Sequence, residues 1–318
     1  MKIRKEYVIL VVLIIALSLY LMMRSTDRNN YQLPELPAII KKDVSKIEIR
    51  RPDSSVLLIK KDDGWEISPQ GYPVNKTEAG YILEAIDELR ITALVSEAKD
   101  YKRYDLDEDK KIIVRAWSGD ILNREFEVGK PASTYQHTFV RLPGDERVYH
   151  ARGNFSGRLS QKMENFRDKN VLAFDQSEIT GIEINREGQS TVWVRKEVPA
   201  PDITEKQDGR EVLPEKTEII WEDKEGKAIE RSSVIRLLNA GSRLTCEDYI
   251  EGAEKEDLAE PIYSIIFAGA KEYRLLIFQK KDKDLKGYPA ISSENNYPFI
   301  ISDSKADDIM QVDSGGSK

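Results

Sequence analysis

Cysteine and histidine are both scarce in this chain of 318 residues, which contains one cysteine, Cys246, and two histidines. A single cysteine cannot form an internal disulfide, nor can it supply the clustered thiolates of a zinc ribbon. Basic residues do not outnumber acidic ones, and the formal net charge is −7. Because an acidic chain repels phosphate backbones, we do not expect a nucleic-acid partner.

Motifs that bind phosphate or carry out hydrolysis are also missing. The chain has neither G-x-G-x-x-G nor a Walker sequence. The acidic run 105–109 begins like a calcium loop, but Lys110 and Ala116 occupy the positions that require Gly and Glu. The stretch GNFSG at 153–157 lacks the G-x-S-x-G spacing of a nucleophile elbow. We therefore expect a protein that is not an enzyme, with no catalytic residues, no cofactor-binding residues and no cofactor.

The two histidines, His137 and His150, come close together if Leu142 pairs with Arg147 in a hairpin. His150 then lies opposite Phe139 and diagonal to His137 on one face of the sheet. Two imidazoles could hold a metal ion with a third ligand, but the sequence places no third ligand beside them. We expect solvated strand histidines and no metal site.

Residues 7–23, by contrast, form a long apolar run without a charge. At 1.5 Å per residue this run spans about 25 Å, the low end of a membrane helix. A cleaved signal peptide is the alternative, but the apolar run continues beyond the weak cleavage site Ala16-x-Ser18, which favours a retained transmembrane anchor. The basic excess before the run predicts that residues 1–6 are cytoplasmic and that the body is extracytoplasmic, on a stalk at 24–43.

Two nearly identical stretches, VSKIEIRR at 44–51 and ITGIEINR at 179–186, lie 135 positions apart. Alternating apolar and polar residues indicate a half-buried strand in each. The offset is 135 at the isoleucines but 156 at the tryptophans, which predicts a 21-residue inserted loop at 197–217. Coincidence between two amphipathic strands is the alternative to duplication. The residues expected to mark equivalent positions are Ile47, Ile49, Arg51 and Trp65 in the first copy and Ile182, Ile184, Arg186 and Trp221 in the second.

These patterns predict an α+β fold of two tandem repeated units, each an antiparallel sheet with helices on one face, behind one N-terminal transmembrane helix. Repeat unit 1 is expected at 44–175, repeat unit 2 at 176–310, and a disordered tail at 311–318. Among the helices, one should follow the N-cap Asn75, and a later one should carry Leu159, Met163 and Phe166 on one side.

The body resembles family 4340 of the domains of unknown function. Five stretches carry the resemblance: the opening strand IEIRR, LLIKKDDGWEIS, KRYDLDED, FVRLPGDERVYHAR, and FRDKNVLAF, which leads into ITGIEINR. One departure is Glu108-Asp109, where the family often has a proline after its Tyr-x-Leu-Asp. The resemblance covers about residues 44–310 and implies a membrane-anchored, extracytoplasmic protein. Family members are often encoded beside ATP-driven transporters related to gliding motility, and no family reaction supplies functional residues.

Two functional hypotheses follow from these observations. The first is a non-enzymatic, membrane-anchored accessory or scaffold protein of a membrane complex, an ABC-type transporter, in the cell membrane as a single-pass protein. Its partners would be the membrane, through the N-terminal helix, and a membrane protein. The second is an envelope hydrolase or a carbohydrate-binding protein, which would require a cleft with convergent carboxylates near Trp65 or Trp221. Either tryptophan could instead be a core aromatic.

Overall fold

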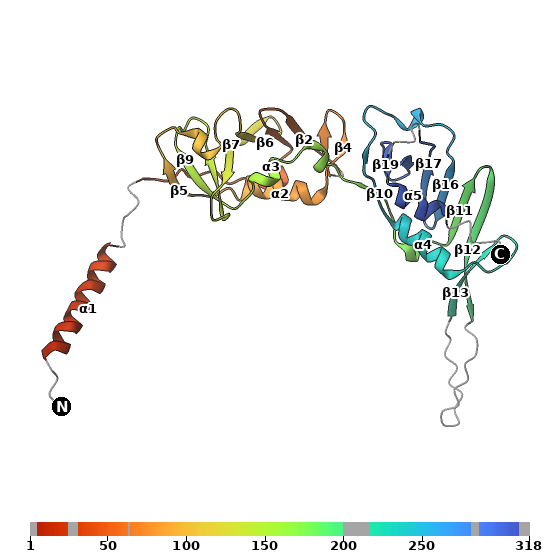
Figure 1. The fold of residues 1–318 in the computed structure, drawn as a ribbon, viewed down its shortest axis with the longest axis horizontal. Helices are drawn as coiled ribbons and strands as arrows, with labels where there is room; N and C mark the ends of the chain where they lie inside the picture. Colours follow the sequence, from red (N-terminus) through yellow and green to blue (C-terminus); the bar gives the residue numbers. More distant parts are fainter. Residues whose placement is uncertain (1–4, 25–30, 63, 200–216, 281–285, 312–318) are drawn as a thin grey trace, which may run out of the picture. The chain divides into compact units, whose positions relative to one another are not determined.

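The computed structural model describes residues 5–24, 31–62, 64–199, 217–280 and 286–311 (Figure 1). The chain divides into two compact units, Met1–Phe166 (unit 1) and Arg167–Lys318 (unit 2), so the boundary falls nine residues before the one expected after residue 175. Parts of the expected cytoplasmic end, stalk, inserted loop and tail lie outside the described residues.

Unit 1 contains one sheet of nine antiparallel strands, in the order β4-β3-β2-β1-β6-β7-β8-β9-β5. Helices α2 and α3 lie on one side of this sheet (Figure 1). The elements of unit 1 are α1 (Lys5–Arg24), β1 (Lys46–Arg50), β2 (Ser55–Lys61), β3 (Gly64–Ser68), β4 (Tyr72–Pro73), α2 (Lys76–Asp87), β5 (Ile91–Ser96), β6 (Ile112–Ser118), β7 (Ile121–Pro131), β8 (His137–Arg141), β9 (Val148–Arg152) and α3 (Ser156–Leu159), with 3-10 turns at Lys41–Asp43, Tyr101–Tyr104 and Met163–Asn165.

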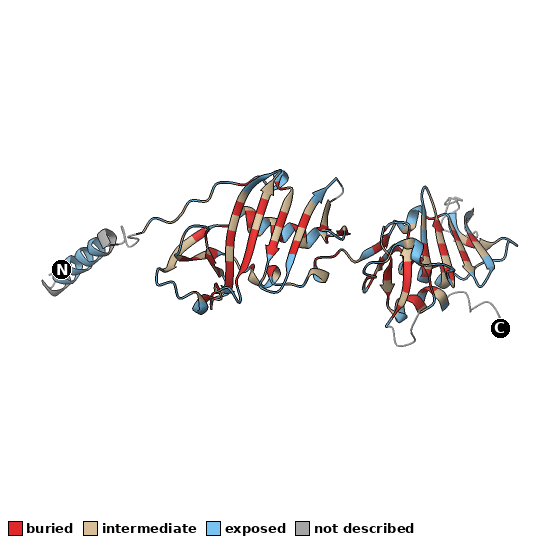
Figure 2. Cartoon of the chain, turned by 90° about the horizontal axis from the view of Figure 1, so that it is seen from above, coloured by how far each residue is buried: buried red, intermediate tan, exposed pale blue. Residues whose placement is uncertain are grey.

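Alternation along the strands builds the core of unit 1, as the banding of buried and half-buried residues in Figure 2 shows. On β1 the burial pattern alternates strictly, and α2 places Ala79, Ile82 and Ile86 in the core. The side chain of Asn75 accepts hydrogen bonds from the backbone N–H groups of Thr77 and Glu78, at 2.9 and 3.3 Å. This confirms the predicted N-cap and fixes where α2 begins.

Unit 2 contains a sheet of eight antiparallel strands, in the order β13-β12-β11-β16-β17-β18-β19-β15, and a separate pair, β10-β14. Its elements are β10 (Asn170–Ala173), β11 (Gly181–Arg186), β12 (Gln189–Pro199), β13 (Thr217–Asp223), α4 (Arg231–Ser242), β14 (Arg243–Thr245), β15 (Asp248–Tyr249), β16 (Tyr263–Ala268), β17 (Glu272–Ile277), β18 (Tyr288–Ser292), β19 (Phe299–Ile301) and α5 (Asp303–Met310), with 3-10 turns at Gln176–Glu178 and Lys255–Asp257.

Helix α4 approaches the sheet of unit 2 closely, with Val234 and Leu237 buried beneath it. A glycine makes this approach possible, because a Cβ atom at Gly241 would lie 2.5 Å from the ring of Phe267. Helix α5 packs against α4 and buries Ala306 and Ile309.

The expected fold class is wrong. None of the helices in the described part of the chain is both long and apolar enough to cross a membrane. The described residues form mainly antiparallel sheets, of nine, two and eight strands. Because the strand counts of the two units differ, two clean tandem copies do not describe the fold.

One further helix expectation is also wrong. The single helix predicted to carry Leu159, Met163 and Phe166 is two short pieces, α3 and the turn Met163–Asn165. Leu159 and Phe166 are nevertheless buried. Packing against the sheet, rather than a continuous helical stripe, accounts for their apolar character.

Candidate functional site

The four marker isoleucines lie on the first strand of each large sheet, and all are buried. Ile47 and Ile49 are on β1, while Ile182 and Ile184 are on β11, and none is more than 1% exposed. Ile47 lies between Leu58 and Ala116 in the sheet, whereas Ile182 lies between Trp193 and Phe267. These residues therefore build the two cores and have no access to a ligand.

The two marker arginines each bind the carbonyl end of a short helix in their own unit. Arg51 donates from its guanidinium to the carbonyl oxygens of Leu159, at 3.3 Å, and Gln161, at the end of α3. Arg186 donates to the carbonyl oxygen of Met310, at 3.4 Å, in the last turn of α5. A cation at the carbonyl end of a helix satisfies acceptors that lack a helical partner.

The two marker tryptophans also occupy similar backbone positions. Trp65 lies opposite Lys60 and its carbonyl accepts from the N–H of Val74 at 2.8 Å, while the carbonyl of Trp221 accepts from Ile229 at 2.7 Å. Trp221 is 7% exposed and Trp65 is half-buried. A ring that stacks on a sugar must be accessible, so Trp221 serves the core of unit 2.

The motifs that were weighed as metal or catalytic sites have structural partners. Asp105 binds Lys110 at 2.8 Å, and Asp107 accepts from the N–H of Asp109 at 3.3 Å, so the acidic run is a closed turn. Ser156 is the first residue of the four-residue helix α3. Across the described ranges, no three His, Cys, Asp or Glu side chains lie close enough together to hold a metal ion.

The two histidines do lie together, on β8 and β9 of unit 1. His150 pairs with Phe139, as the expected hairpin register requires, and its ring stacks on that of His137 with 5.3 Å between centroids. Both side chains are half-buried, and Nε2 of His150 is buried with no hydrogen-bond partner in the part of the chain that the structure describes. Burial, followed by the nearby His137, lowers the pKa of His150.

Ion pairs lie on the same face of this sheet region, because Arg141 follows His137 and Phe139 at every second position of β8. Glu127 accepts from Lys111 at 2.9 Å and from Arg141 at 2.5 Å, and Arg141 also lies over the ring of Tyr101, 4.3 Å from its centroid. Burial alone would raise the pKa of Glu127, but the hydrogen bonds from Arg141 and Lys111 outweigh it and hold that pKa below its ordinary value. The carboxylate is therefore ionised at neutral pH and serves as a structural anchor.

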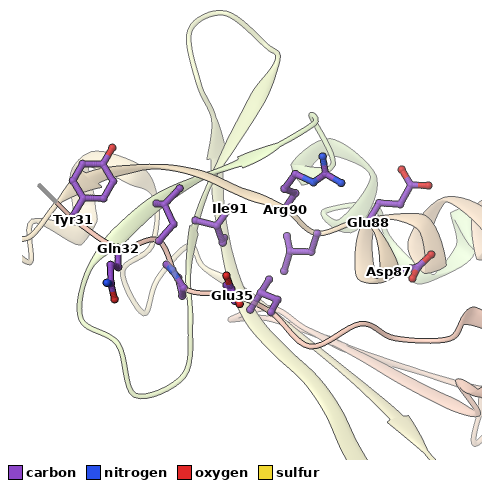
Figure 3. Close-up of a pocket in the computed structure, with 11 residues that line it drawn as sticks. Tyr31, Gln32, Glu35, Asp87, Glu88, Arg90 and Ile91 are labelled. Atoms are coloured by element: carbon purple, nitrogen blue, oxygen red, sulfur yellow. The ribbon is translucent and has the colours of Figure 1, made fainter. Parts of the chain in front are cut away.

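Two adjoining hollows lie in unit 1. The first, of about 1080 Å³, lies between the segment Tyr31–Leu36 and the connection from α2 to β5, Asp87–Ile91. Tyr31 and Gln32 lie at one end of this hollow, and Asp87 and Glu88 lie at the other (Figure 3). Its lining is mainly polar backbone and side chains that are exposed or half-buried.

The second hollow, of about 760 Å³, shares residues 87–90 with the first. Three arginines line it from three different segments: Arg90 after α2, Arg152 at the end of β9 and Arg158 in α3. The sequence alone did not single out these arginines, because no local spacing relates them. Only the pairing of β5 with β9 and the packing of α3 against β7 bring them to one hollow.

The fold and these sites define a protein of two antiparallel-sheet units whose marker residues are structural. The chain belongs to the family described as Domain of unknown function (DUF4340), whose model matches residues 65–261. The matched range runs across the boundary between the two units. No curated protein and no solved structure matches the chain.

Proposed function

We propose that this protein is a non-enzymatic accessory or scaffold protein of a membrane complex, with its two sheet units on the extracytoplasmic side. The observation that carries this proposal is the surface of α1. Its large apolar side chains are exposed all round the helix, each by more than half of its area: Ile9, Leu10, Val11, Val12, Leu13, Ile14, Ile15, Leu17, Leu19 and Tyr20. A contiguous apolar surface of this kind requires a cover of lipid or of another protein.

The partner we propose is a transporter of the ABC type. Support for this part comes from the family resemblance, since members are often encoded beside such transporters. The extracytoplasmic side is supported by the same family resemblance, which implies an extracytoplasmic protein. No specific observation favours the carbohydrate-binding alternative, because Trp221 is buried.

Co-purification from native membranes in mild detergent tests the proposal. The wild-type protein should bring down the permease and ATPase subunits of one transporter in a fixed ratio. The variant Ile14→Lys with Leu17→Lys places two charges on α1. It should be recovered neither in the membrane fraction nor with the transporter subunits. A matched control is Ile121→Lys with Leu122→Lys, because these side chains are also exposed but lie on β7.

Recovery of the wild-type protein without any transporter subunit would refute the scaffold hypothesis. The side of the membrane is tested separately, by adding trypsin to intact spheroplasts. We expect digestion of both units, while a cytoplasmic marker stays intact. Full protection until the cells are lysed would contradict the extracytoplasmic placement.

A further inference from the structure

Two contacts position the three arginines that line the second hollow of unit 1. The backbone N–H of Arg152 donates to the carbonyl of Arg90 at 3.0 Å, which holds these two residues side by side. The guanidinium of Arg158 lies over the ring of Tyr81, 3.4 Å from the centroid, and faces the same hollow. Stacking on an aromatic ring orients a guanidinium and leaves its N–H edge available.

Acidic residues also line this hollow, and most of them already have cationic partners. Lys41 lies 3.5 Å from a carboxylate oxygen of Asp87 and 3.8 Å from one of Glu88. Glu78, just outside the lining, lies 3.6 Å from Arg158. Asp87 and Glu88 share the one charge of Lys41, and the carboxylate of Glu84 has no cationic partner among the described residues.

Two cations remain. The side chains of Arg90 and Arg152 are exposed, and neither makes an ion pair, hydrogen bond or ring contact within the described residues. The lining holds three arginines and three carboxylates, those of Glu84, Asp87 and Glu88, so its formal charge is balanced. The guanidinium groups of Arg90 and Arg152 are nevertheless without a partner in the described part of the chain, and they are available to an anion.

The floor of the hollow is apolar. Leu89 and Phe155 line it and are 6% and 8% exposed, and the ring of Tyr81 forms part of its wall. Guanidinium groups match the geometry of a phosphate, because they donate two parallel hydrogen bonds to its oxygens. A ligand with a phosphate beside an apolar portion would satisfy both the cations and the floor.

The chain also limits how far the adjoining hollow lies from α1. The adjoining hollow, which shares residues 87–90, is lined by Tyr31, only seven residues after the last residue of α1. Seven extended residues span at most about 25 Å. If α1 contacts the membrane, lipid headgroups are therefore within reach. We propose that the hollow lined by Arg90, Arg152 and Arg158 binds the phosphate of a lipid headgroup, an inference that rests on the proposed membrane association of α1.

Calorimetric titration of the full chain in detergent tests this proposal with three probes: dioctanoyl phosphatidylglycerol, dioctanoylglycerol and inorganic phosphate. We expect the phosphatidylglycerol to bind, the dioctanoylglycerol not to bind, and inorganic phosphate to compete only weakly. The variant Arg90→Gln with Arg152→Gln should weaken binding of the phosphatidylglycerol about tenfold or more, since it removes two charge-assisted contacts. Its folding should be unaffected, because neither side chain has a partner.

The matched control is Arg231→Gln with Arg236→Gln, which removes the same charge from exposed positions of α4 in unit 2. Equal losses in both double variants would overturn the site, because the binding would then depend on overall charge. Inorganic phosphate that competes as strongly as the lipid would overturn the headgroup assignment. If the wild-type chain does not bind the phosphatidylglycerol but still co-purifies with a transporter, the lipid site is refuted and the scaffold proposal stands.

Discussion

In unit 1 the central strand β1 pairs with β2 and β6, and in unit 2 the central strand β11 pairs with β12 and β16. The inward positions of the two strands are filled differently. Ile47 lies between Leu58 and Ala116, whereas Ile182 lies between Trp193 and Phe267. Equivalent pairing therefore supports aliphatic neighbours at this position in unit 1 and aromatic neighbours in unit 2.

The outward positions differ even more. On β1, Glu48 lies opposite Arg115 and their side chains are 3.0 Å apart, while on β11, Glu183 lies opposite Ile266. The outer face of unit 1 is thus crossed by ion pairs, and that of unit 2 is partly apolar at the same place. The backbone pairing does not determine these faces, so each unit can contact a different neighbour.

The largest effect we expect comes from truncating the shared inward positions. Ile49 and Ile184 are both 0% exposed, and replacing either with Ala should cost about 2–5 kcal/mol. Each loss should fall in its own unit, as measured by hydrogen exchange of peptides from that unit. Ile121→Ala, at a position 70% exposed, should change stability by less than about 0.5 kcal/mol. A loss below about 1 kcal/mol at Ile49 or Ile184 would contradict the core assignment.

A smaller effect should separate the two marker arginines. Arg51 is half-buried and binds Ser54, Leu159 and Gln161, whereas Arg186 is exposed and makes one long hydrogen bond to Met310. Arg51→Gln should cost about 1 kcal/mol, because buried acceptors lose their donor. Arg186→Gln should lower the free energy of unfolding by only a few tenths of the loss caused by Arg51→Gln. Urea denaturation measures both, and equal losses would show that the two contacts are energetically equivalent.

Much of the strand content could be predicted from alternation. The strands expected within 44–51 and 179–186 are β1 and β11, and the Asn75 cap fixes α2. Shorter elements such as β10 and β15 carry too few residues for a period of two to be visible, and their positions depend on pairing with distant strands. Alternation does not apply to the apolar run at 7–23, whose 17 uncharged residues lie at the lower limit for a membrane helix.

Sites were harder to predict than strands. The hairpin register of His150 and Phe139 followed from a local turn, so the sequence was enough to bring the histidines together. Arg90, Arg152 and Arg158 come from three elements whose proximity depends on the order of strands in the sheet. No spacing rule in one sequence contains that order.

A third comparison concerns the outer faces. Glu48→Gln should cost about 0.2–1 kcal/mol at low salt, because it removes the ion pair with Arg115, in which both side chains are 25% exposed. Glu183→Gln should have almost no effect, since the carboxylate of Glu183 accepts a hydrogen bond from the neutral side-chain amide of Asn185, at 3.2 Å. A double-mutant cycle of Glu48 with Arg115, repeated at high salt, should show a coupling that salt reduces. A coupling that salt leaves unchanged would mean that the pair acts through packing.

The smallest difference we expect is in pH dependence, and it should be confined to unit 1. Both histidines of the chain, His137 and His150, are in that unit, and unit 2 has none. The groups that face His150 are the rings of His137 and Phe139, while the hydroxyl of Thr92 donates to its backbone carbonyl at 3.1 Å. No carboxylate among these neighbours would stabilise a charged imidazole.

Burial and then His137 lower the pKa of His150 in the folded state below its ordinary value of 6.5. Below that value the unfolded chain binds a proton that the folded chain does not yet bind, so stability falls as pH falls from 6.5 toward the folded-state pKa. Above 6.5 both states are neutral and this contribution is fully retained. The carboxylate with the most depressed pKa nearby, Asp145, has a pKa of about 2 in the fold and an ordinary value of 3.8, so it acts only at lower pH.

Hydrogen exchange of unit 1 peptides, corrected for the intrinsic pH dependence of exchange, should therefore show a loss of protection between about pH 7.5 and 5.5 that unit 2 peptides lack. The variant His150→Phe should abolish this loss, because phenylalanine keeps the ring contact with Phe139 and cannot be protonated. His137→Phe should reduce it, since one of the two causes of the lowered pKa is removed. If the His150→Phe protein kept the full pH dependence, a group other than the stacked histidines would have to be its source.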